Sequence, residues 1–161
     1  MDVDERIPIA FADVVGAALT SSHFIPTEIA VAYGNERPPV CARFAPPVPP
    51  HFLNMATRKA MNDMEVEWRD KGLPASWIPN FLNVNITKNA LIYVKDEATE
   101  WWFFQYVPHG RFKNVGTTVQ QLQTLSPGKP HCGDHVTSTN QCALRTVNLL
   151  KSLVYHASGQ Q

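Results

Sequence analysis

The apolar stretch at residues 90–107 constrains the fold more than any other part of the chain. It contains two runs, Leu91–Val94 and Trp101–Val107, that are rich in the β-branched and aromatic residues favoured in strands. The polar residues Lys95–Thr99 between them have a suitable length for a hairpin loop. Side chains alternate along a strand, and both faces of these runs are apolar. We therefore expect a hairpin at the centre of a sheet, covered on both sides.

The first half of the chain contains further strand and helix patterns. Thr27–Tyr33 and Val40–Phe44 are joined by turn-forming residues, which predicts a second hairpin. Before it, apolar residues recur at helical spacing, so we expect a helix over residues 9–20. The four prolines in residues 45–50 favour an extended polyproline conformation.

The second half begins with the clearest helical pattern. Residues 54–71 carry an apolar stripe and a charged face, and Asn54 is a suitable capping residue. Leu82–Thr87 alternates between apolar and polar side chains, as a strand near a sheet edge does. The apolar face of residues 140–157 predicts a terminal helix, whereas residues 108–130 match no single pattern.

Helices and strands therefore occur in blocks, without a sustained strand–helix–strand alternation. This order is typical of an α+β protein, and we expect a mostly antiparallel sheet of about five strands centred on the hairpin at 90–107. A chain of 161 residues suits a single domain, 1–161. The three expected helices cover residues 9–20, 54–71 and 140–157.

The charge balance narrows the choice of partners. Lys plus Arg and Asp plus Glu both number 14, so no overall positive field favours nucleic acid or an anionic membrane. No apolar run reaches the length of a transmembrane helix, and the first residues are acidic where a presequence would be basic. The three cysteines are too few for a disulfide scaffold. We expect a soluble, intracellular and cytoplasmic protein without a membrane partner.

A metal-ligand pattern occurs late in the chain. His131, Cys132 and His135 fall in one expected loop, with Asp134 among them and Cys142 seven residues further on. The spacing matches no established zinc finger, and only Asp134 or Cys142 is at hand as a fourth ligand. We therefore expect no metal and no other cofactor. Zinc at His131, Cys132 and His135 is the alternative.

No motif of an enzyme family is present. The sequence has no nucleophile elbow, no H-E-x-x-H motif and no phosphate-binding glycine loop. Acid–base catalysis needs no local motif, and the charged residues at one end of the expected hairpin are the first candidates for it. A solvated turn explains them more simply, so a non-enzymatic role is favoured. These residues are Asp96, Glu97, Glu100, His109 and Arg111.

Two patterns concern binding partners. Arg43–Pro49 fits the R-x-x-P-x-x-P arrangement of polyproline ligands, although the same prolines can form a rigid connection between elements. The aromatic hairpin has the composition of a base-stacking platform, but the neutral chain lacks the basic surface that nucleic-acid binding needs. Nucleic acid is therefore disfavoured as a partner.

The aromatic residues favour a protein partner instead. Aromatic side chains are enriched where proteins meet, and two adjacent tryptophans are hard to bury together in a small domain. We expect a non-enzymatic interaction or structural subunit of a larger assembly, or a homo-oligomer, that uses an aromatic-rich sheet face. The alternative is a small single-domain enzyme or small-molecule-binding protein with an apolar pocket against the sheet. The expected contact residues are Trp101, Trp102, Phe104, Tyr106, His109 and Arg111.

Overall fold

In the computed structural model, the chain folds around one five-stranded sheet. The described residues are 7–20, 23–45, 55, 59, 72–118, 121 and 142–158. The strands are β1 (Ile9–Thr20), β2 (His23–Tyr33), β3 (Val40–Arg43), β4 (Leu91–Val94) and β5 (Arg111–Asn114). The helices are the 3-10 helix η3 (Ala75–Trp77), α2 (Ile78–Asn85), α3 (Glu97–Phe104) and α5 (Ala143–Ser158). The expected α+β class is confirmed.

The sheet is mixed. Its strand order is β3-β2-β1-β4-β5, with β1 antiparallel to β2 and β2 antiparallel to β3. β4 pairs in parallel with β1, and β5 pairs in parallel with β4. The expected number of about five strands is confirmed. The sheet is less antiparallel than expected because helices precede β4 and β5 in the chain, and parallel neighbours need such crossover connections.

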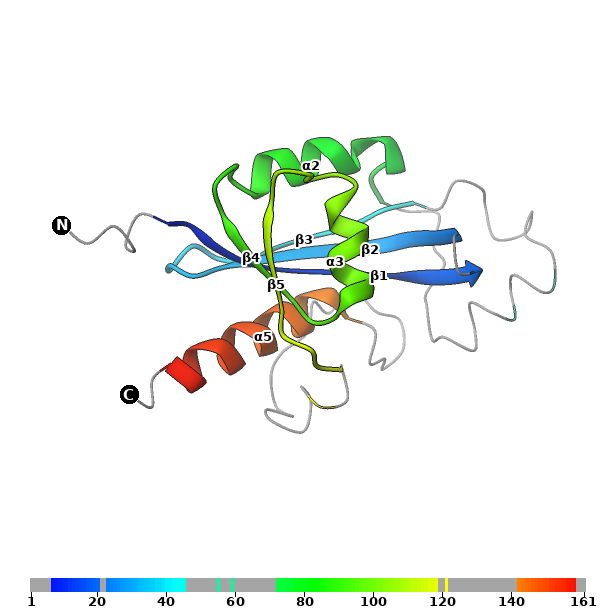
Figure 1. Cartoon of the computed structure of the whole chain (residues 1–161). Helices are drawn as coiled ribbons and strands as arrows, with labels where there is room; N and C mark the ends of the chain where they lie inside the picture. The colour runs from blue at the N-terminus through cyan, green and yellow to red at the C-terminus, as the bar shows by residue number, and fades with distance from the viewer. Residues whose placement is uncertain are drawn as a thin grey trace.

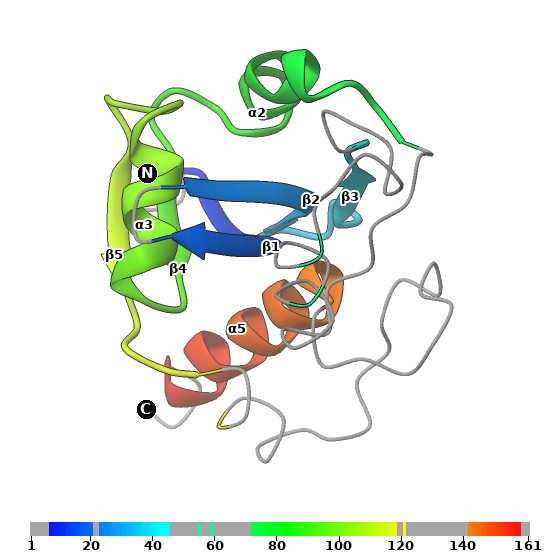
Figure 2. The ribbon, with the colours of Figure 1, turned by 90° about the vertical axis from the view of Figure 1, so that its right-hand side faces the viewer.

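Helices cover both faces of the sheet. α5 lies on one face, while α2 and α3 lie on the other (Figures 1 and 2). The core on the α2 and α3 side includes Ile29, Ile92 and Phe103, all fully buried. The core on the α5 side includes Phe11 of β1 and Leu150 of α5. β1 and β2 therefore lie between two apolar layers, which is why both of their faces are apolar.

Several expected elements are confirmed. β2 and β3 form the second hairpin, with Glu28 opposite Arg43, and α5 covers most of the expected terminal helix. Of the expected helix over residues 54–71, only Met55 and Lys59 are described, and both are helical. The prolines of the R-x-x-P-x-x-P pattern lie outside the described residues.

The expected helix over residues 9–20 is wrong, because this segment is strand β1. Apolar residues occupy most of its positions, so they satisfy helical spacing and strand alternation alike. Its neighbours decide the outcome, since β1 pairs with β2 along its length and with β4 at Ile9–Phe11. The β-branched residues Val14 and Val15 belong to the cores on opposite faces of the sheet, which only a strand allows for adjacent residues.

The expected hairpin at 90–107 is only half present. Its first run is β4, but its second run begins with helix α3. Asp96 caps this helix, because its Oδ1 accepts a hydrogen bond from the backbone N of Thr99 at 2.8 Å. Glu97 and Glu100 in the first turn also favour a helix N-terminus. The residues interpreted as a hairpin loop are therefore a helix start.

The expected strand Leu82–Thr87 is wrong for a related reason. Leu82 belongs to helix α2, and Pro79 occupies its first turn, where proline is tolerated. Alternating apolar residues also lie four apart, and the pair Leu82 and Ile86 is buried on one side of this segment. Over so few residues the period of a strand cannot be distinguished from that of a helix, so packing against the sheet selects the helix.

Candidate functional site

Two buried carboxylates are the most distinctive chemical groups in the described part of the chain. Asp13 of β1 and Glu28 of β2 are both fully buried. The strand register places Ala30 opposite Asp13 and Val15 opposite Glu28. The two acids are therefore diagonal neighbours on one face of the sheet, the face that α5 covers. Because a buried charge is costly unless it is paired, each acid must have a specific partner.

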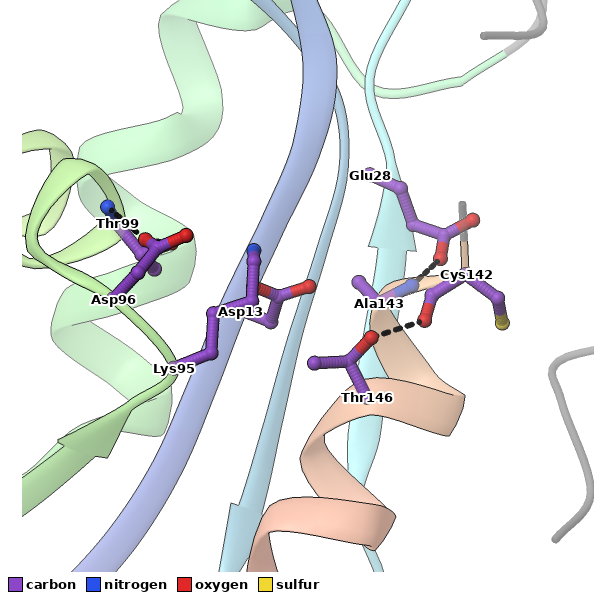
Figure 3. Close-up of polar contacts among 8 residues, drawn as sticks. All are labelled: Asp13, Glu28, Lys95, Asp96, Thr99, Cys142, Ala143 and Thr146. Carbon is purple, nitrogen blue, oxygen red and sulfur yellow. Dashed lines mark hydrogen bonds and ion pairs between the residues drawn. The ribbon is translucent and has the colours of Figure 1, made fainter. Parts of the chain in front are cut away.

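The partner of Asp13 is Lys95. Lys95 directly follows β4, which lies beside β1, and its Nζ lies 2.5 Å from Oδ1 of Asp13 (Figure 3). Oδ2 of Asp13 has no hydrogen-bond partner in the described part of the chain. Burial raises the pKa of the Asp13 carboxyl, and Lys95 opposes this shift. Burial acts to lower the pKa of Lys95, but the attraction of Asp13 outweighs it and the pKa is raised.

Asp96 adds a second acid to this group. Its Oδ1 accepts hydrogen bonds from the backbone N and the Oγ1 of Thr99, at 2.8 and 2.6 Å. Its negative charge also contributes to the raised pKa of Asp13. The cap fixes Asp96 next to Lys95. Asp13, Lys95 and Asp96 thus form a charged group where β4 ends and α3 begins.

Glu28 holds the start of α5 on the sheet. Its Oε1 accepts a hydrogen bond from the backbone N of Ala143 at 2.6 Å, across 115 residues of sequence (Figure 3). Its Oε2 lies 3.3 Å from Nη1 of Arg43 on β3. The first N–H groups of a helix have no partner within the helix, and a carboxylate there also meets the positive end of the helix dipole. Glu28 therefore fixes where α5 begins.

Cys142 lies beside this contact. It directly precedes Ala143 and is only 1% exposed. Its carbonyl oxygen accepts hydrogen bonds from the backbone N and the Oγ1 of Thr146, at 3.1 and 3.0 Å. Figure 3 shows Cys142 and Glu28 next to each other at the first turn of α5. The sulfur of Cys142 points away from the Glu28 carboxylate, whose hydrogen bond goes to the backbone of Ala143 (Figure 3).

These two side chains are both zinc-ligand types. The other candidates from the sequence, His131, Cys132 and His135, lie outside the described residues. Within the described ranges, no group of three or more His, Cys, Asp or Glu side chains is placed to hold a metal ion.

Helix α3 places some of the residues expected to contact a partner on the surface and others in the core. Trp101 and Phe104 point to the surface, with exposures of 64% and 44%, and their ring centroids are 6.2 Å apart. Trp102 is 9% exposed and belongs to the core together with its neighbour Phe103. Tyr106 packs partly buried against Trp102. The expected contact face is therefore a face of a helix rather than of the sheet.

The charged residues expected at the end of the hairpin are also placed by α3. Glu97 accepts a hydrogen bond from Nε1 of Trp101 at 3.2 Å, one helical turn away. His109 is exposed beyond the helix, and Arg111 is exposed on β5, where it donates to the carbonyl oxygen of Asn89 at 2.7 Å. These contacts give Asp96, Glu97 and Arg111 structural roles, and none of them requires an acid–base function.

A pocket opens at the other end of β2. Its volume is about 410 Å³, and it is lined by residues from β1, β2, the β2–β3 turn, α2 and α5. The lining is mixed in polarity, whereas an apolar pocket was the expectation for a small-molecule binder. Its main groups are Ile9, Tyr33, Asn35, Arg37, Asn85 and Tyr155.

Asp13, Glu28 and Lys95 were not predicted as site residues from the sequence. A signal for the two acids was present, since each interrupts an otherwise apolar strand-like run. A charged residue in a buried strand predicts a specific partner. Lys95 could not be matched to Asp13 in advance, because the pairing of β1 with β4 is a tertiary contact across 82 residues.

The comparisons leave the function to be argued from this geometry. No family model matches the chain, and no curated protein matches its sequence. None of the helices in the described ranges is long and apolar enough to cross a membrane.

Proposed function

We propose that the chain is a protein–protein interaction subunit that binds a second copy of itself through the exposed aromatic face of α3. The observation that carries this proposal is the pair Trp101 and Phe104, which are 64% and 44% exposed and in contact with each other. Single exposed apolar residues are common, but a tryptophan packed against a second aromatic residue has the character of an interface anchor.

The aromatic pair is held rigidly. Trp102 and Phe103 of the same helix are in the core, and Asp96 caps the helix start. The Trp101 ring is further fixed by its hydrogen bond to Glu97. Ordering the side chains of an interface on binding costs free energy. A face whose side chains are already ordered pays less of this cost, which favours affinity.

The aromatic pair suits a second copy as the partner. In a two-fold interface the same surface meets itself, and aromatic rings pack favourably against aromatic rings. The basic residues Arg111 and Lys113 of β5 are not part of this surface, because their register beside Leu91 and Tyr93 puts them on the face of the sheet that α5 covers.

Sedimentation equilibrium of the purified chain tests the proposal. We expect a dimer, and we expect Trp101→Ser to raise its dissociation constant at least about tenfold, as removal of an interface anchor does. Trp77→Ser is the matched control, since Trp77 is 52% exposed on η3, away from α3, and this variant should dimerise like the wild type. A wild-type monomer at about 100 μM would overturn the proposal, because a specific dimer forms well below this concentration. An equal effect of the two substitutions would do the same.

A further inference from the structure

Among the described residues, the pocket at the end of β2 has a single charged group in its lining. Arg37 supplies this guanidinium, and none of the described lining residues is Asp or Glu. Glu36, its neighbour in the turn, is exposed and does not line the pocket. Lys151 of α5 adds a second positive charge nearby, because its Nζ donates to the carbonyl oxygen of Asn35 at 3.1 Å. The local charge is therefore positive in a chain whose net charge is zero.

Arg37 is held in a defined position by its neighbours. Its guanidinium carbon lies 4.1 Å from the centroid of the Tyr33 ring, in a cation–π contact. Its backbone N donates to Oδ1 of Asn35 at 2.9 Å, which fixes the turn. Its Nη2 lies 3.4 Å from Oδ1 of Asn85, a long contact. The contacts place the guanidinium at the pocket and use few of its donors.

The groups that position Arg37 are themselves fixed. The hydroxyl of Tyr33 donates to the carbonyl oxygen of Asn85 at 2.7 Å, and Nδ2 of Asn85 donates to the carbonyl oxygen of Phe81 at 2.8 Å. Burial raises the pKa of Tyr33, with Arg37 opposing the shift, so this hydroxyl stays protonated and remains a donor. The amide oxygen of Asn85 is thereby turned toward Arg37.

The free donors of Arg37 define the ligand chemistry. A guanidinium has five N–H donors in a planar fork that matches a carboxylate or a phosphate, and within the described part of the chain only one of them has an acceptor. Ile7, Ile9 and Ala90 supply apolar surface in the same pocket. A volume of about 410 Å³ lies in the usual range for small-molecule sites, about 300–1,000 Å³.

We infer that this pocket binds a small organic anion, with its carboxylate or phosphate on Arg37 and its apolar body against Ile7, Ile9 and Ala90. The inference is independent of the proposed dimer, because Trp101 and Phe104 do not line the pocket. It names the chemical class of the ligand for the alternative of a small-molecule-binding protein, and it requires no catalytic step.

NMR titration of the full chain with four probes tests the inference. The probes are benzoate, phenyl phosphate, the neutral analogue benzamide and inorganic phosphate. We expect benzoate or phenyl phosphate to shift the amide signals of Tyr33, Gly34 and Arg37 with a Kd of about 1 mM or tighter. Benzamide and inorganic phosphate should each bind at least about tenfold more weakly, since one lacks the charge and the other the apolar body. The better of the two organic anions identifies the preferred head group.

Variants separate the pocket from general charge effects. Arg37→Gln should weaken binding by about 10- to 100-fold, the loss expected for hydrogen bonds to a charged group. Lys113→Gln, which removes an exposed positive charge on β5, should leave binding unchanged. Equal binding of benzamide and benzoate, or equal affinities of the two variants, would overturn the inference. Binding that appears only after Asp4→Asn and Glu5→Gln would also overturn the inference. It would mean that the acidic side chains of the chain itself are the ligands of the site.

Discussion

Replacing Lys95 with methionine tests the buried ion pair from which the charged group is built. Methionine keeps much of the volume of lysine but removes the charge that lies 2.5 Å from Oδ1 of Asp13. Both side chains are well buried, with exposures of 15% for Lys95 and 1% for Asp13. Water therefore cannot replace the ammonium without disturbing the packing between β1 and β4. The variant leaves a buried carboxylate without its counter-ion.

The expected loss of stability is large. Removing one partner of a buried pair costs about 3–5 kcal/mol, because the remaining charge is left without compensation. Asp13 is at the severe end of this range, since its Oδ2 already has no hydrogen-bond partner among the described residues. A domain of this size has a stability of about 5–15 kcal/mol, so the loss is easily measured.

Urea unfolding of a double-mutant cycle provides the assay. The second variant is Asp13→Leu combined with Lys95→Met, which replaces the pair with apolar residues. We expect it to recover most of the stability lost by Lys95→Met, because replacing a whole buried pair is often neutral or stabilising. The single variant Asp13→Leu completes the cycle, and the coupling between the two positions should be about 3 kcal/mol or more.

The pH dependence gives an independent check with a definite sign. The raised pKa of Asp13 means that the folded state binds its proton more tightly than the unfolded state does. The free energy of unfolding therefore falls as pH rises from 3.8, the ordinary value, through the folded pKa. Lys95→Met removes the group that opposes this shift, so the folded pKa of Asp13 rises further. The destabilisation by Lys95→Met should thus shrink on acidification from about pH 7 to about pH 4.

Two results would refute this reasoning. A loss of less than about 1 kcal/mol in Lys95→Met would mean that the carboxylate is solvated or has another partner. A double variant as unstable as the single one would mean that the volume of Lys95, and not its charge, is what matters.

Three further predictions concern the fold. Asp96→Ala should lower the free energy of unfolding by about 1 kcal/mol through loss of the α3 cap, and Asp96→Ser should recover part of it. Phe103→Ala should lower the free energy of unfolding by about 3–5 kcal/mol, since the Phe103 ring is fully buried. Phe104 is exposed, so Phe104→Ala should lower it by about 1 kcal/mol or less. Equal losses would contradict the placement of these residues on helix α3. Gly34→Ala should lower the free energy of unfolding by about 1–3 kcal/mol, because its Cβ would lie 2.5 Å from Oη of Tyr155. Urea midpoints measure all three predictions. An unchanged midpoint in Gly34→Ala would mean that the turn adjusts easily to the added methyl group.

The sequence by itself determined the parts of this protein that have an unambiguous pattern. The hairpin of β2 and β3 was predicted because turn-forming residues separate two strand-like runs. The terminal helix was predicted because sixteen residues allow a periodic apolar face to repeat several times. The α+β class followed from the grouping of such elements.

Short apolar segments were decided by their tertiary neighbours. In β1 apolar residues occupy most positions, and in α2 the periods of a strand and of a helix coincide over a few residues. Only the adjacent element selects one structure in each case. Local chemistry pointed to the start of α3, where Asp96 is a capping residue followed by two acids, but the aromatic run that follows favoured a strand.

The charged contacts were beyond the reach of the sequence. Asp13 meets Lys95 across 82 residues, and Glu28 meets Ala143 across 115. Each contact exists because strand pairing or helix docking brings remote segments together. The energy of a buried charge depends on whether a partner lies within hydrogen-bonding distance, and this depends on tertiary structure rather than on spacing along the chain.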